Sequence, residues 1–159
     1  MLQHVHDLVI SGGLAIWAVA IAWKDWRSHR VPNVALVLLL VPALLALVVN
    51  GKGLLGVAIL PSLMGFFIGG GILLPGYAIG KMGAGDVKFA ACMGLLLGPL
   101  ATLKMLLVFA IILGALSAAV WLVHRHVPES GKRRIAAAPA LAVGFIVQLF
   151  AESLLWSFF

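Results

Sequence analysis

The chain has 159 residues, of which 64% are hydrophobic and only 10% are charged. A soluble globular domain carries about 25% charged residues, so this composition excludes a soluble protein and favours a polytopic membrane protein. The net charge is +6, but the 11 basic residues lie in the gaps between apolar segments. That distribution is typical of topology signals, and no nucleic-acid partner is predicted.

Six apolar segments fit a bilayer whose hydrocarbon core needs about 20 helical residues. The sequence therefore predicts an all-α, polytopic transmembrane helical bundle that forms one domain over residues 1–159. Its spans are expected at about 7–24, 33–50, 54–79, 86–98, 101–123 and 135–158. The N-terminal stretch lacks a basic n-region and a cleavage signal, so we interpret it as a retained first span. The fourth segment is too short to cross unaided, and the Gly-Pro pair at 98–99 separates it from the fifth.

The basic residues indicate an orientation. Nine of the eleven lie in the first, third and fifth gaps between spans, and only Lys52 and Lys104 lie in the second and fourth. By the positive-inside rule the odd gaps are cytoplasmic and both termini are outside. Asp25 ends the first span and Asp86 begins the fourth, so the chain crosses the membrane twice between them. Both carboxylates are therefore expected on the same side of the membrane, whichever orientation holds.

Glycines are concentrated in the middle of the chain, where ten of the 18 lie between residues 65 and 98. The stretches "GFFIG" and "GLLLG" have the small-xxx-small spacing that predicts close packing between membrane helices. The stretch "GKMGAGD" cannot form a long helix, and it predicts either a turn with positive φ or a close backbone approach beside Asp86. Irregular backbone at membrane depth is tolerated only where protein or a water-filled cavity satisfies its polar groups.

Each aspartate has an ordinary structural interpretation when it is taken alone. Asp25 could be an interface residue paired with a neighbouring basic residue, and Asp86 could be the N-cap of the fourth helix. As a pair they are less ordinary, since an acid within a membrane helix costs about 2.5–3.5 kcal/mol. Two carboxylates brought close cannot comfortably both ionise, so one keeps a proton while the other is charged. Such a pair can hydrolyse a peptide bond by general acid–base catalysis without a metal.

Two stretches of the sequence resemble a known family. "GAGDVKFAACMGLLLG" is similar to the GxGD signature of the type IV prepilin peptidases, which are membrane-embedded aspartic proteases, and "DWRSHRVPN" is similar to their first catalytic segment. The near-terminal "AAAPALAVGFIV" resembles their final span. The resemblance implies that Asp25 and Asp86 are the catalytic pair, that Gly83 and Gly85 are the signature glycines, and that Lys88 is the lysine of the motif. Lys88 could tune Asp86, contact the substrate or anchor its helix at the interface.

The resemblance also implies an activity and a location. It indicates a multi-pass endopeptidase of the bacterial inner membrane that removes a short basic leader from a pilin-like precursor at the cytoplasmic face, with no cofactor. Larger members carry a cytoplasmic insert with two cysteine pairs and methylate the new N-terminus. This chain has a single cysteine, Cys92, within an apolar segment, so N-methyltransferase activity is not expected. The compact form resembles the stand-alone peptidases of tight-adherence (Flp-type) pili, while the client and the oligomeric state stay open.

Two other classes of protein stay open on the sequence. A small ion-coupled transporter would use Glu152 or Asp86 as its coupling acid and the interrupted third-to-fourth region as a discontinuous helix. A non-catalytic assembly subunit of a pilus or secretion system would tolerate Asp25→Asn.

Metal-dependent and serine chemistry are not indicated, because the sequence has no H-E-x-x-H motif and no G-x-S-G motif with a histidine inside a span. His4, His6 and Asp7 are interpreted as polar flank rather than metal ligands. The five tryptophans, which mostly lie near predicted span ends, are interpreted as interface residues.

Overall fold

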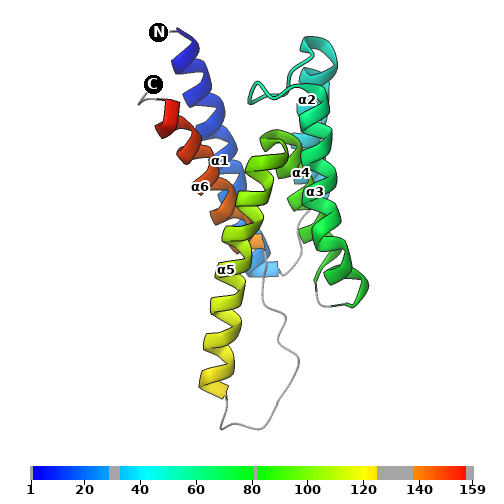
Figure 1. Cartoon of the computed structure of the whole chain (residues 1–159), viewed down its shortest axis with the longest axis vertical. Coiled ribbons are helices and arrows are strands. Elements are labelled where there is room, and N and C mark those ends of the chain that lie inside the picture. The colour runs from blue at the N-terminus through cyan, green and yellow to red at the C-terminus, as the bar shows by residue number, and fades with distance from the viewer. Residues whose placement is uncertain (1, 29–32, 81, 125–137, 157–159) are drawn as a thin grey trace.

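The computed structural model describes residues 2–28, 33–80, 82–124 and 138–156. Six helices account for most of them (Figure 1): α1 (Leu2–Ser28), α2 (Asn33–Asn50), α3 (Ile59–Ala78), α4 (Ala84–Leu97), α5 (Pro99–His124) and α6 (Ala138–Trp156). All six predicted apolar segments therefore contain a helix, and the expected all-α bundle is confirmed. Three of the helices are long and apolar enough to cross a membrane, namely α2, α3 and the Pro99–Ala119 part of α5.

The helix boundaries differ from the predicted spans in two informative places. The third helix begins at Ile59 rather than at residue 54. Residues 51–58 instead form a compact connection in which Gly51 and Gly56 have φ values of 67° and 77°. The Gly53 amide donates to the Val57 carbonyl oxygen at 2.7 Å. The first helix continues to Ser28, so Asp25 lies inside its last turn rather than just beyond its end.

Helix α4 is short, but it lies at the centre of the bundle. Its 14 residues are about 21 Å long, less than the roughly 30 Å of a hydrocarbon core. Every residue from 89 to 98 is buried, and α4 contacts α2, α3, α5 and α6. A helix that is apolar on all sides belongs inside a protein. Surrounding helices, not lipid, therefore cover most of the fourth segment.

The contact between α3 and α4 is made by glycine backbones. A Cβ atom added to Gly65 would collide with the Gly94 carbonyl, and one added to Gly69 would collide with the Ala90 carbonyl. The two helices can approach this closely because Gly65, Gly69 and Gly94 have no side chain to hold the backbones apart. The prediction that "GFFIG" and "GLLLG" pack helices closely is confirmed.

This contact predicts opposite effects for two glycines of the same helix. Gly65→Ala should lower the stability of the bundle by about 1–3 kcal/mol, because the added methyl group forces α3 away from α4. Gly71→Ala is the matched control, since an added Cβ meets nothing within 4 Å, and helix propensity then favours alanine slightly. Thermal unfolding of both variants in detergent measures the difference. Equal melting temperatures would contradict the packing role of Gly65.

Candidate active site

The two candidate catalytic carboxyl groups lie at facing helix ends. Asp25 is in the last turn of α1, and Asp86 is in the first turn of α4. In Figure 1 these helix ends lie away from the N and C termini of the chain. The two side chains are close enough to interact electrostatically. The structure thus brings together two acids that are 61 positions apart in the sequence.

Asp25 faces the inside of the bundle. It is only 5% exposed, whereas Lys24 on one side and Arg27 on the other are exposed. The guanidinium of Arg27 lies 6.0 Å from the centre of the Trp23 ring, on the outer face of α1. The burial of Asp25 does not fit a side chain that is solvated at the membrane interface, while its pairing with a neighbouring basic residue stays an open alternative. Arg30 lies outside the described residues.

Trp17 fixes the face of α1 that carries Asp25. Its indole nitrogen donates to the Ala35 carbonyl of α2 at 3.2 Å, and its ring lies 5.6 Å from that of Phe89 in α4. Asp25 follows Trp17 by about two helical turns, so both residues lie on roughly the same side of α1. Trp17 is half-buried among three helices. Trp17 therefore contacts protein as well, which the sequence did not predict, because it does not show which side of a helix meets protein.

Asp86 also has a role in starting α4. One of its carboxylate oxygens accepts a hydrogen bond from the Gly83 amide at 3.3 Å, and its own amide donates to the Gly83 carbonyl at 3.1 Å. Gly83 is thus the N-cap, and Asp86 is the third residue of the helix, the acidic position of a capping box. The alternative in which Asp86 itself is the N-cap is wrong, because α4 already begins at Ala84, two residues before Asp86. The side chain is partly buried and remains next to Asp25.

The glycines before Asp86 serve the turn in different ways. Gly80 has a φ of 68°, a conformation that favours glycine, and its amide donates to the Tyr77 carbonyl at 2.9 Å. Gly83 has an ordinary extended φ of −79°. A Cβ atom added to Gly83 would lie 3.2 Å from a carboxylate oxygen of Asp86, so glycine there allows the close approach that the sequence predicted. Gly85 is in the first turn of α4, and its functional role stays a prediction.

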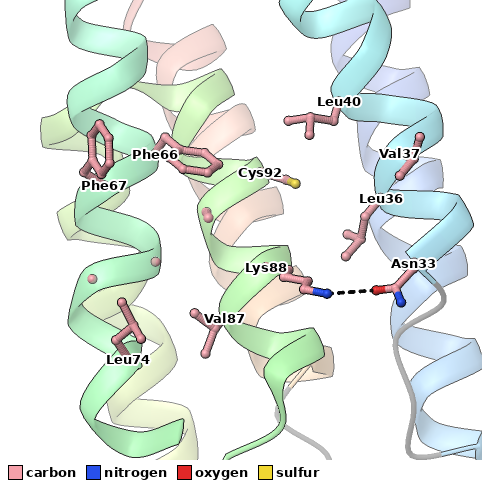
Figure 2. Close-up of a pocket in the computed structure, with 13 residues that line it drawn as sticks. Asn33, Leu36, Val37, Leu40, Phe66, Phe67, Leu74, Val87, Lys88 and Cys92 are labelled. Atoms are coloured by element: carbon pink, nitrogen blue, oxygen red, sulfur yellow. Dashed lines mark hydrogen bonds between the residues drawn. The ribbon is translucent and has the colours of Figure 1, made fainter. Parts of the chain in front are cut away.

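Lys88 points away from Asp86. Two residues along a helix correspond to a rotation of about 200°, so the two side chains leave α4 on different sides. The Lys88 ammonium donates to the Asn33 side-chain oxygen at 3.4 Å, which links the starts of α2 and α4. Figure 2 shows this pair at one end of an apolar groove between α2, α3 and α4. Of the roles considered for Lys88, this geometry favours contact with a molecule bound in the groove over tuning of the Asp86 carboxyl group.

The sequence did not predict this groove, because its lining comes from three separate helices. Cys92 lines it as well and is buried, as expected for a small apolar side chain. Pro32, the neighbour of Asn33 in the resemblance, lies outside the described residues.

Other candidate groups do not extend the site. In the part of the chain that the structure describes, no three His, Cys, Asp or Glu residues lie together as metal ligands would. The side chains of His4, His6, Asp7 and Glu152 lie outside the described part, so neither an outer metal site nor the transporter alternative is tested at those positions. A buried carboxyl group facing a second one is equipped to move protons to and from a water molecule without a metal.

A bundle of apolar helices with a paired carboxyl site defines a helical membrane protein that can carry out acid–base chemistry. The chain matches the model of the type IV leader peptidase family over residues 13–123, which is more than half of its length. The chain therefore belongs to this family and is a membrane peptidase. No curated protein and no solved structure gives a significant match. The family match includes Asp25 and Asp86 but ends before α6, so the likeness of the near-terminal stretch to the family's final span stays a prediction.

The capping role of Asp86 can be separated from any catalytic role. Asp86→Ala should destabilise the protein by about 0.5–1 kcal/mol, because the Gly83 amide loses its acceptor. Asp86→Asn should be nearly neutral, because the amide oxygen can still accept that hydrogen bond. Thermal unfolding in detergent provides the measurement. If alanine and asparagine are equally stable, the hydrogen bond does not contribute to the stability of α4.

Proposed function

We propose that this peptidase is an aspartic endopeptidase that removes the leader peptide from pilin-like precursors and that Asp25 and Asp86 are its catalytic residues. One observation carries the proposal: a carboxyl group that is 5% exposed at the end of α1 interacts with a second carboxyl group at the start of α4. A structural role alone does not require two acids to face one another, since like charges there lower stability.

The chemistry follows from one proton shared by two carboxyl groups. The ionised aspartate takes a proton from a water molecule as the water oxygen attacks the peptide carbonyl carbon, and the protonated aspartate donates to the carbonyl oxygen. Collapse of the tetrahedral intermediate then breaks the C–N bond, and a carboxyl group supplies the proton that the leaving nitrogen needs. The pair titrates as one unit with two apparent constants. No cofactor takes part in the proposed reaction.

The substrate is proposed to be a precursor with a short basic leader followed by one apolar helix. The positive-inside distribution of basic residues supports a location of both aspartates at the cytoplasmic face of the bacterial inner membrane, with both chain termini outside. The scissile bond would lie where the leader meets the membrane. The chain is proposed to cleave without methylating the new N-terminus. Cleavage assays with different precursors would identify the client, either a tight-adherence pilin or another pilin-like protein.

The catalytic pair predicts that either aspartate is indispensable. With purified protein and a pilin precursor in detergent or liposomes, Asp25→Asn and Asp86→Asn should each reduce leader release at least a thousandfold, because each removes a proton donor or acceptor of the reaction. Asp7→Asn is the matched control, since it makes the same change about 27 Å from Asp25 along α1. Gel mobility and mass spectrometry of the product provide the readout. Undiminished cleavage by Asp25→Asn would show that the protein does not use this pair.

The shared proton predicts a bell-shaped dependence of the cleavage rate on pH. As the pH falls through the lower apparent pKa, both carboxyl groups become protonated and no base is left. As it rises through the upper one, both ionise and no acid is left. The rate should therefore fall on the acid side between about pH 3 and 7. Circular dichroism at each pH separates this loss from unfolding, and a flat rate over that range would contradict the mechanism.

A further inference from the structure

The groove between α2, α3 and α4 has a volume of about 520 Å³ and is lined by 13 residues. All of them are apolar or glycine except Asn33 and Lys88, which lie together near one end (Figure 2). Leu40 and Phe66 lie toward the other end. The groove exists because α2 packs mainly on α4 and stands apart from α3.

The wall formed by α3 has a small-residue gap between the large side chains of Phe66, Phe67 and Leu74. Gly70 and Gly71 line it, and a Cβ atom added to Gly71 would meet nothing within 4 Å. Ala91 of α4 continues this small-residue surface at the base of the groove. Small residues at a membrane-helix surface allow the backbone of another helix to approach closely. Such a surface therefore fits the backbone of a helix. A flexible chain could follow an apolar surface of any shape and would not need small residues there.

The size of the groove fits part of a helix. Along α2 it runs from Asn33 to Leu40, which is about 10 Å at the helical rise per residue. A helix segment of that length and about 10 Å in diameter has a volume of roughly 800 Å³. The groove would therefore embed about two turns of a helix on one side and leave the other side facing lipid.

The groove reaches the first turn of α4, the turn that also carries Asp86. Val87 lines it and directly follows Asp86 in the first turn of α4. Its two polar side chains, Asn33 and Lys88, lie at this same end. A chain that passes from an extended scissile segment into a helix has unpaired carbonyl groups in the extended segment, which need donors in a membrane, and unpaired amide groups in the first helical turn, which need acceptors. The Lys88 ammonium can donate to such a carbonyl group, and the Asn33 side chain, which has both a donor and an acceptor, can bind either kind of group.

We propose that the groove binds the first two turns of the precursor's apolar helix, directly after the bond to be cut, and that Asn33 and Lys88 bind the backbone where this helix begins. The proposal rests on the proposed function and extends it, since it makes the client's membrane helix, and not only its leader, part of what the peptidase recognises. The groove would then hold the scissile bond at a fixed distance from Asp86.

Gly71 offers a way to fill the groove without disturbing the fold. Gly71→Leu places an apolar side chain in open space within the groove, whereas Gly114→Leu, the matched control, places the same side chain in open space on α5. With full-length precursor, Gly71→Leu should raise KM at least tenfold, because the client helix is displaced. Gly114→Leu should stay within twofold of the original protein. An unchanged KM for Gly71→Leu, with the original protein active, would overturn the groove proposal and leave the proposed function standing.

Photo-crosslinking tests occupancy directly and does not depend on cleavage. A benzophenone amino acid replaces Val37, which lines the groove and is 53% exposed, or Leu38, which is 71% exposed and does not line it. In an Asp25→Asn background, position 37 should crosslink to the first two turns of the precursor's helix and position 38 should not. Crosslinks from position 37 to lipid alone would show that lipid fills the groove. If the original protein releases no leader yet position 37 captures the precursor helix, the proposed function fails and the binding groove stands.

Discussion

Direct backbone contact between α3 and α4 holds the short central helix in place, and the position of the site follows from it. Lipid tails are as apolar as the helices, so burial of apolar surface gives little drive for membrane helices to associate, and close van der Waals packing must supply it. Gly65 against Gly94 and Gly69 against Ala90 provide that packing. Because α4 is held along its length, Asp86 in its first turn has a defined place relative to α1.

The paired carboxyl groups are costly for such a protein, and their placement limits the cost. Both lie in terminal turns of helices, where polar backbone and the Gly83 amide are available, rather than at a helix centre. Trp17 docks α1 on α2 and α4 through a hydrogen bond and a ring contact, which turns Asp25 inward. Packing between three helices therefore keeps together two acids that would separate in isolation.

The apolar groove differs from the rest of the lipid-facing surface in shape and in polarity. Elsewhere α2 presents large apolar side chains outward, such as Val34 and Val48, each 78% exposed, which is expected for a surface that meets lipid. The groove instead has two adjacent glycines, Gly70 and Gly71, in one wall and a polar end at Asn33 and Lys88. The proposed substrate helix would use both features: a surface against which the helix packs and polar side chains where the helix begins.

The sequence alone determined the helical class, the approximate helix positions and the same-side placement of Asp25 and Asp86, because hydropathy and the number of crossings depend only on the order of residues. It also indicated the close α3–α4 contact, since small-xxx-small spacing reports local packing. Tertiary structure decided which side of each helix faces protein. That choice buried Asp25 while exposing Lys24, packed Trp17 against α2 and α4, and turned Lys88 toward a groove rather than toward Asp86. Such choices depend on contacts between helices distant in sequence, and no local pattern encodes which neighbours a side chain will meet.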